Sequence, residues 1–240
     1  MRFVTVLAIS AVALALVSSA YAQAPERVPP PFIAVTGEGE VQIPPDLATV
    51  QLGVESTSPS AQTAQGEVSE RVQQILRRIR ALGIPEEQIR TTRLTLLPVY
   101  AGRRPDESGE QRVVGYRATN IVQVEVRDLE LAGPVIDAGL AGGANRVEGL
   151  TYGLRDDSEP RLRALRQAAA EARRKAAALA SALDVGLGPP LEVQEGGGVI
   201  VPRFEMARAA GGAVETPVQP GLITVRANVS VRYRLIANKD

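Results

Sequence analysis

The chain contains no cysteine and no histidine among its 240 residues. Without cysteine it can form no disulfide bond, thiolate nucleophile or thiolate metal site. Without histidine it lacks the side chain that most often transfers protons near neutral pH and most often binds metal ions. These absences exclude Ser-His-Asp and Cys-His catalysis, zinc proteolysis and zinc deamination. Carboxylate catalysis and a hard-cation site made of Asp and Glu stay open.

Aromatic residues are scarce, at 3% of the chain, and neither sign of charge is in excess, with 27 basic and 27 acidic residues. A balanced charge gives no broad positive field, so the composition does not support a nucleic-acid partner. The apolar residues are mainly alanine, valine and leucine. This composition favours Val-rich strands covered by Ala-rich helices.

Long apolar runs are absent beyond the first residues. Arg2, the apolar residues 3–17 and the small residues before Ala22 together predict a secretory signal peptide over residues 1–22, cleaved after Ala22. An uncleaved anchor is the alternative. No later run reaches the roughly twenty apolar residues that cross a bilayer. We therefore expect a periplasmic mature chain without a transmembrane segment, with association at the envelope or outer membrane as a further hypothesis.

Residues 23–31 are polar and proline-rich, which predicts an extended tether before the folded domain. Residues 33–55 then alternate apolar and polar side chains on both sides of residues 44–46, Pro-Pro-Asp. This pattern predicts a hairpin of two half-buried strands, with Asp46 bonding the turn backbone. Gly37 and Gly39 in the first arm indicate a bulge or a close backbone approach, and a bulge is the favoured interpretation.

Apolar periodicity predicts the order strand, strand, helix, strand, strand, helix, strand, helix, strand, strand. The expected helices cover residues 58–82, 129–140 and 162–183, and the later strands cover residues 89–100, 113–126, 147–154, 191–195 and 222–236. Ser58 and Ser158 are the expected N-caps of the first and last helix. We expect one α+β domain over residues 32–240, with a mostly antiparallel sheet and amphipathic helices on one face. Two lobes sharing one sheet are an alternative.

The helix over residues 162–183 is expected to bury one apolar stripe. Its members recur every three or four residues: Leu162, Leu165, Ala169, Ala172, Ala176, Leu179 and Leu183. The alanines would let the helix axis lie close to the sheet. Ala172→Leu should therefore overpack that contact by about 1 to 3 kcal/mol.

Residues 196–221 are rich in glycine and proline and have little periodicity, so a long mobile loop is expected there. The segment nevertheless carries the apolar residues Ile200, Val201, Phe204 and Met206. These apolar side chains indicate that the loop packs against another surface, such as that of a partner chain.

Two groups of carboxylates are candidate sites. Glu38, Glu40 and Asp46 lie in the predicted hairpin and could pair as acid and base. The second group, Asp156, Asp157 and Glu159, could bind calcium. The spacing of these carboxylates does not match that of a twelve-residue calcium-binding loop, so we favour a cluster that caps a helix.

The remaining candidates are glycine-rich, basic or sequon-like segments. Residues 36–39 and 196–198 contain glycines but lack the rest of a phosphate-binding loop. Residues 228–230 spell a glycosylation sequon inside a predicted strand, which we interpret as chance. Arg226, Arg232 and Arg234 alternate along the last strand, and a solvated face is favoured over a site for an anionic ligand or a neighbouring subunit.

Three segments carry a family resemblance. They are VTGEGEVQIPPDLATVQLGV at residues 35–54, AAAEARRKAAALASALDV at residues 168–185 and PGLITVRANVSVRYRL at residues 220–235. With them the chain resembles the SIMPL domain family, whose bacterial members include envelope-associated immunogenic proteins. Asp184-Val185 departs from the glycine that many members have after the helix, which affects only its cap. The resemblance covers nearly all of the mature chain.

The resemblance implies an exported α+β protein that assembles into rings or cage-like homo-oligomers, with bacterial members linked to envelope and oxidative stress. It brings no catalytic residues, cofactor or metal ligands, and we assign none. A non-enzymatic, oligomer-forming envelope protein is therefore the leading hypothesis. A carboxylate-based hydrolase of cell-wall glycan and a periplasmic binder of small ligands or peptides, using a cleft between helices and sheet, are the alternatives.

Overall fold

The computed structural model describes residues 30–102, 111–202 and 219–237. The order of its helices and strands is the predicted one, and the predicted α+β class with antiparallel sheets is confirmed. The predicted signal peptide (residues 1–22) and nearly all of the predicted tether (residues 23–31) lie outside the described residues. Cleavage after Ala22 therefore stays a prediction.

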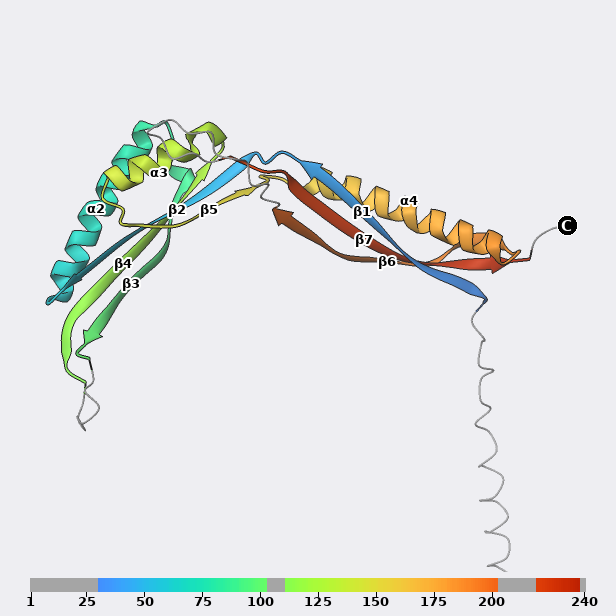
Figure 1. Ribbon diagram of the computed structural model, residues 1–240, viewed down its shortest axis with the longest axis horizontal. Helices are drawn as coiled ribbons and strands as arrows, with labels where there is room; N and C mark the ends of the chain where they lie inside the picture. The colour runs from blue at the N-terminus through green and yellow to red at the C-terminus, as the bar shows by residue number, and fades with distance from the viewer. Residues whose placement is uncertain (1–29, 103–110, 203–218, 238–240) are drawn as a thin grey trace, which may run out of the picture.

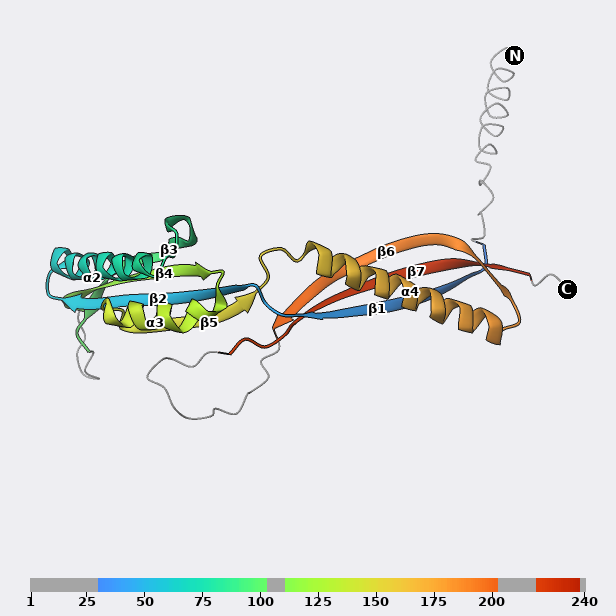
Figure 2. The same cartoon turned by 90° about the horizontal axis from the view of Figure 1, so that it is seen from above.

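One lobe, which we call the α4 lobe, is a three-stranded antiparallel sheet covered on one face by the longest helix (Figure 1). Its strands are β1 (Phe32–Ile43), β7 (Ile223–Ile236) and β6 (Gly186–Pro202), in the order β1-β7-β6, and its helix is α4 (Ser158–Ala182). The helix packs mainly on β1 and β7 (Figure 2). Val193 of β6 consequently stays 61% exposed, although it pairs with the buried Val231.

The other lobe, the α2–α3 lobe, is a four-stranded antiparallel sheet in the order β3-β4-β2-β5. Its elements are β2 (Leu47–Ser58), α2 (Ala61–Ala81), the 3-10 turn η1 (Glu86–Gln88), β3 (Ile89–Tyr100), β4 (Val113–Val126), the 3-10 turn η2 (Leu129–Leu131), α3 (Ala132–Ala141) and β5 (Arg146–Gly153). It is inserted between β1 and α4. The two lobes therefore have separate sheets rather than one shared sheet, and each has its own core.

The predicted hairpin of β1 and β2 is wrong. β1 pairs with β7, whereas β2 pairs with β4 and β5. Residues 44–46 lead from one lobe to the other (Figure 1). Alternation shows that each strand has one buried face, but it does not identify the pairing partner, which lies far away in the sequence.

Asp46 binds the second connection between the lobes rather than its own turn. Its N–H donates to the carbonyl of Gly153 at 3.1 Å. Its carboxylate accepts from the N–H of Arg155 at 2.7 Å and pairs with the Arg155 guanidinium at 3.2 Å. Because residues 44–46 and 154–157 carry the chain between the lobes, these bonds tie both connections together.

The buried stripe of α4 differs from the predicted one. It consists of alanines at every fourth position, namely Ala164, Ala168, Ala172, Ala176 and Ala180. The predicted members Leu162, Leu179 and Leu183 are 46 to 62% exposed. Large side chains cannot face β1 because the two backbones are too close, so only alanine fits the contact.

Gly37 and Gly39 make this close approach possible. A Cβ atom at Gly37 would lie 2.0 Å from the carbonyl oxygen of Ala168, and one at Gly39 would lie 1.9 Å from that of Ala164. The pairing of β1 with β7 runs without a register shift from Phe32 to Ile43. The two glycines therefore mark a close approach and not the favoured bulge. We call this glycine–alanine contact the α4–β1 seam.

The two predicted helix N-caps, Ser58 and Ser158, are wrong. The N-cap of α2 is Ser60, whose side chain accepts from the N–H of Thr63, because Ser58 still belongs to β2. Likewise the N-cap of α4 is Asp157, and Ser158 is the first helical residue. Pairing with distant strands extends β2 further than local capping signals indicate.

The expected long loop begins later than residue 196. β6 continues through Gly196 to Pro202 because these residues pair with β7 up to Ile223. Residues 203–218, with Phe204 and Met206, lie outside the described residues. Mobility of that segment and its contact with a partner stay predictions.

We predict that Gly37→Ala destabilises the protein by about 1 to 3 kcal/mol, because the new methyl group must displace the α4 backbone. Gly149→Ala is the matched control, since nothing lies within 4 Å of a Cβ atom there. The free energy of unfolding from urea denaturation checks both. Equal stability of the two variants would contradict the close approach at the seam.

Candidate functional site

The sheet of the α4 lobe has an open face on the side opposite α4. Along β7, alternate residues point toward α4 and are buried, while Arg226, Asn228 and Arg232 between them are exposed. Glu38 and Glu40 of β1 are exposed in the same alternation. A mixed set of carboxylates, amides and guanidinium groups therefore covers this face.

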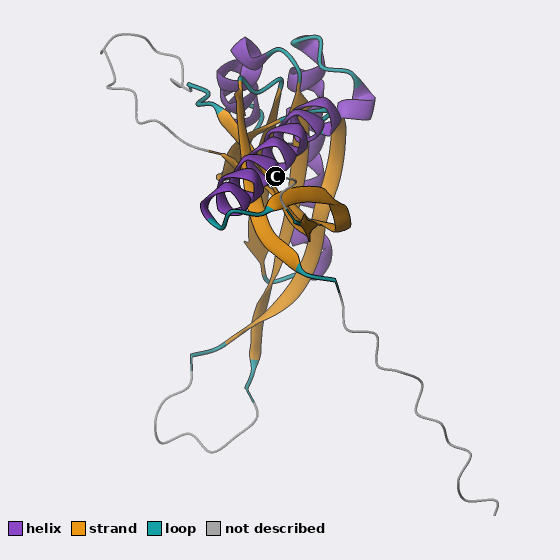
Figure 3. Ribbon diagram, turned by 90° about the vertical axis from the view of Figure 1, so that its right-hand side faces the viewer, coloured by secondary structure: helices purple, strands orange, loops and turns teal. Residues whose placement is uncertain are grey.

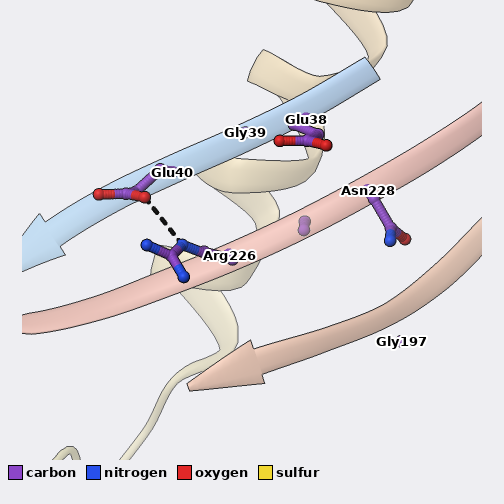
Figure 4. A pocket seen from close by; sticks show the side chains of 7 residues that line it. Glu38, Gly39, Glu40, Gly197, Arg226 and Asn228 are labelled. Atoms are coloured by element: carbon purple, nitrogen blue, oxygen red, sulfur yellow. Dashed lines mark hydrogen bonds and ion pairs between the residues drawn. The ribbon is translucent and has the colours of Figure 1, made fainter. Parts of the chain in front are cut away.

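The first hollow on the open face has a volume of about 380 Å³. Its lining combines strands β1, β7 and β6: Glu38, Gly39, Glu40, Arg226, Ala227, Asn228 and Gly197 (Figure 4). Arg226 Nε donates to Glu40 Oε2 at 2.8 Å. The side chains of Glu38 and Asn228 lie at the other end of the hollow, and the described residues provide no hydrogen-bond partner for either.

A second hollow of about 380 Å³ lies farther along the same face, between Thr36, Ser230 and Gln194. There Arg232 pairs with Glu192 at 3.0 Å and places its guanidinium carbon 4.1 Å from the centre of the Phe32 ring. Arg226 and Arg232 thus share one face, as the alternation predicts. Each is held by a carboxylate of a neighbouring strand, whereas Arg234, the third member of the predicted stripe, is exposed near the end of β7.

A third hollow, the edge groove, lies between α4 and the outer edge of β1 and has a volume of about 480 Å³. Side chains from α4 bond the edge backbone of β1 here. Gln167 Oε1 accepts from the N–H of Glu40 at 3.2 Å, and Glu171 Oε2 accepts from the N–H of Glu38. Lys175 Nζ donates to the carbonyl of Thr36 at 3.0 Å. We call Gln167, Glu171 and Lys175 the edge ladder.

The edge ladder changes the protonation of one of its members. The hydrogen bond from the Glu38 N–H, and then the bond from Lys175, hold the pKa of Glu171 below its ordinary value. Both partners favour the charged carboxylate over the neutral acid. Glu171 therefore acts as an acceptor for the strand edge and is unsuited to be a general acid.

Of the first predicted carboxylate group, the structure brings Glu38 and Glu40 together at the first hollow but leaves Asp46 outside it. Glu40 pairs with Arg226, and Asp46 pairs with Arg155 at the connection between the lobes, away from the lining of the first hollow. The other group lies at the start of α4: hydrogen bonds from the Ser158 side chain and then from its N–H lower the pKa of Asp156, and Asp157 pairs with Arg161. Within the described residues, no group of acidic side chains is arranged to hold a metal ion.

The glycine-rich candidates lie inside strands. Residues 36–39 belong to β1, and the described glycines of residues 196–198 belong to β6. Neither segment forms a loop before a helix, so neither provides the helix N-terminus that binds phosphate. Residues 228–230 lie in the middle of β7.

Sequence reasoning missed an apolar surface at the end of β3 and β4. These strands extend past the helices of the α2–α3 lobe (Figures 1 and 3). Six residues there, which we call the apolar ribbon, are 42 to 60% exposed: Leu94, Leu96, Leu97, Tyr100, Val113 and Val114. The available signal was Leu94-Thr95-Leu96-Leu97, which places leucine on both alternations of an expected half-buried strand.

Comparison with known proteins identifies relatives over most of the chain. The sequence model of the SIMPL family, described as a protein of unknown function (DUF541), matches residues 33–233. The chain is 28% identical over 215 residues to the 26 kDa periplasmic immunogenic protein of Brucella melitensis biotype 1, covering 86% of this chain and 85% of that protein. It is 28% identical over 190 residues to the uncharacterized protein YggE of Edwardsiella ictaluri, covering 79% and 78%. The YggE protein of Escherichia coli K12 is also 28% identical, over 186 residues that cover 78% and 74%.

None of these names assigns an enzymatic activity, and two of the three proteins are called uncharacterized. The periplasmic location in the Brucella name agrees with the compartment expected from the sequence. In the part of the chain that the structure describes, no helix is long and apolar enough to span a bilayer.

We predict that acid weakens the wild-type protein more steeply than Glu171→Gln. Because the pKa of Glu171 is lower in the folded than in the unfolded state, the folded state binds fewer protons, and stability falls as pH falls. The contribution is present above the ordinary value of 4.5 and is lost as pH drops through the lower folded value. Urea denaturation between about pH 5 and pH 3 measures the slopes. Parallel curves for the two proteins would contradict the role of the charged carboxylate.

Proposed function

Because the chain belongs to the SIMPL family, we propose that it is an exported, non-enzymatic subunit of a homo-oligomer in the bacterial periplasm. In this proposal the assembly serves envelope integrity or tolerance of oxidative stress. The apolar ribbon is the observation that supports the proposed assembly, because contiguous exposed apolar surface on a soluble protein usually marks an interaction site.

The apolar ribbon is exposed because the helices do not reach it. Helix α2 packs on β4 and β2, and β3 forms the outer edge of the sheet. Leu94 on the helix side of β3 is consequently 58% exposed, and Leu97, which faces the other way, is 60% exposed. Because full burial of a leucine contributes about 1.5 to 3 kcal/mol, burying the exposed part of each of these side chains contributes about 1 to 2 kcal/mol.

Both faces of the ribbon are apolar, which favours a second copy of this chain as the partner. Leu96 pairs with Ala118, which points toward the helices, so Leu94 and Leu96 lie on the helix side of the sheet. Leu97 lies on the opposite side, since neighbouring strand residues alternate. A strand that offers apolar surface on both sides can contact one neighbour on each side, as a subunit of a repeating assembly does.

The side chains that line the hollows on the open face support a non-enzymatic role. The Arg226–Glu40 and Arg232–Glu192 pairs occupy the open face with opposite charges that satisfy each other. The sequence supplies no histidine or cysteine to these hollows. Hydrolysis of peptidoglycan fragments that disappears in Glu38→Gln would overturn the non-enzymatic part of the proposal.

We predict that the mature protein sediments as an oligomer and that Leu94→Ser/Leu97→Ser shifts it to the monomer. The serines remove apolar surface that association would bury, without changing the charge. The matched control is Leu162→Ser/Leu179→Ser, which replaces two leucines of α4 that are 47% and 46% exposed. Sedimentation velocity over a range of concentrations measures the mass. A monomeric wild type, or an unchanged oligomer in the ribbon variant, would count against the proposal.

The cellular role has its own test. A strain lacking the gene should be more sensitive than its parent to peroxide and to detergent. The wild-type gene and the α4 control variant should restore resistance, whereas Leu94→Ser/Leu97→Ser should not. Full rescue by a ribbon variant that is monomeric in solution would separate the stress role from assembly and contradict the proposal.

A further inference from the structure

β1 is an unusually regular edge strand. All 12 of its residues pair with β7 without a register shift, and it contains no proline. The other described edges are interrupted. The ladders of β3, β5 and β6 contain register shifts, and β3 and β6 also contain prolines. Bulges and prolines blunt an edge against pairing with another chain, so β1 is the described edge most in need of another protection.

The edge ladder covers this edge with matched spacing. Gln167, Glu171 and Lys175 are four residues apart on α4, a rise of about 6 Å per step. Their partners Glu40, Glu38 and Thr36 are two residues apart on β1, a rise of about 6.7 Å per step. Because the two rises nearly agree and the directions are opposite, each successive side chain meets the next outward-facing backbone group.

The acceptors and the donor of the edge ladder also match the backbone groups that they face on β1. Two side-chain oxygens accept from the N–H groups of Glu40 and Glu38, and one ammonium donates to the carbonyl of Thr36. Lys175 pairs with Glu171 at 3.2 Å, which holds both side chains along the edge. The ladder therefore fills hydrogen-bonding positions that the backbone of an added strand would otherwise take.

We propose that the edge ladder closes β1 against strand addition by a second copy of this chain. The α4–β1 seam positions the helix backbone against Gly37 and Gly39, and the ladder side chains extend from the same helix over the edge. Opening the ladder exposes a regular strand edge, whose natural partner is the identical edge of another molecule in an antiparallel pair. The proposal does not depend on the apolar ribbon, which concerns a different sheet.

The test removes the ladder in the mature chain with Gln167→Ala/Glu171→Ala/Lys175→Ala, the open-edge variant. Alanine favours helix, and net charge is unchanged. To separate the result from ribbon-mediated assembly, the variant is made in the Leu94→Ser/Leu97→Ser background. The matched control is Glu159→Ala/Arg166→Ala in the same background, which removes another exposed ion pair of α4.

Sedimentation velocity and amide hydrogen exchange of residues 32–43 provide the readouts. The open-edge variant should form dimers or larger species as concentration rises, at least tenfold more readily than the control, and its β1 amides should gain protection in those species. Adding Glu38→Pro should abolish the association, because proline removes an outward-facing donor that β7 does not use.

Other outcomes overturn the proposal. They are a mass distribution of the open-edge variant equal to that of the control, association without protection of residues 32–43, and association that persists with Glu38→Pro. Circular dichroism checks that α4 remains folded. If the triple variant loses helicity, Gln167→Ala/Lys175→Ala keeps the bond from Glu38 to Glu171 and should show a weaker form of the same association, and its absence there would equally overturn the proposal.

Discussion

The direct contact of the α4 backbone with the β1 backbone is the constraint on which the α4 lobe depends. Gly37 and Gly39 provide the space, and alanine at every fourth position of α4 fills it. Any larger side chain on either side would separate the two elements. The same contact fixes where Gln167, Glu171 and Lys175 reach, so packing on one face of β1 also determines the chemistry at its edge.

The two lobes manage their sheet edges differently. In the α4 lobe, a regular edge is covered by polar side chains and the open face is neutralised by paired charges. In the α2–α3 lobe, the end of β3 and β4 leaves leucine, valine and tyrosine exposed. In the proposed assembly, association is directed to the apolar ribbon and suppressed at the β1 edge. That division suits an assembly protein, which must join copies of itself in one geometry.

Much of the fold follows from the sequence. Periodicity identifies the α-helices and strands of the described residues in order, because each element has one buried face with its own repeat. It fails where partners are distant: residues 33–55 have the pattern of a hairpin, yet β1 belongs to β7 and β2 to β4 and β5. The buried stripe of α4 is misassigned because leucine is more hydrophobic than alanine and is therefore expected on the buried face. The short distance between the α4 and β1 backbones, however, leaves room only for alanine. The candidate carboxylates Glu40 and Asp46 are identified as residues, but their arginine partners lie 186 and 109 positions away, and no local signal reveals them.

Amide hydrogen exchange of the mature wild-type protein at low and high concentration tests most directly which surface joins the copies. If copies join through the apolar ribbon while the edge ladder keeps β1 closed, residues 89–100 gain protection as concentration rises and residues 32–43 exchange at the same rate in both samples. Protection that appears at residues 32–43, with residues 89–100 unchanged, would contradict both assignments at once.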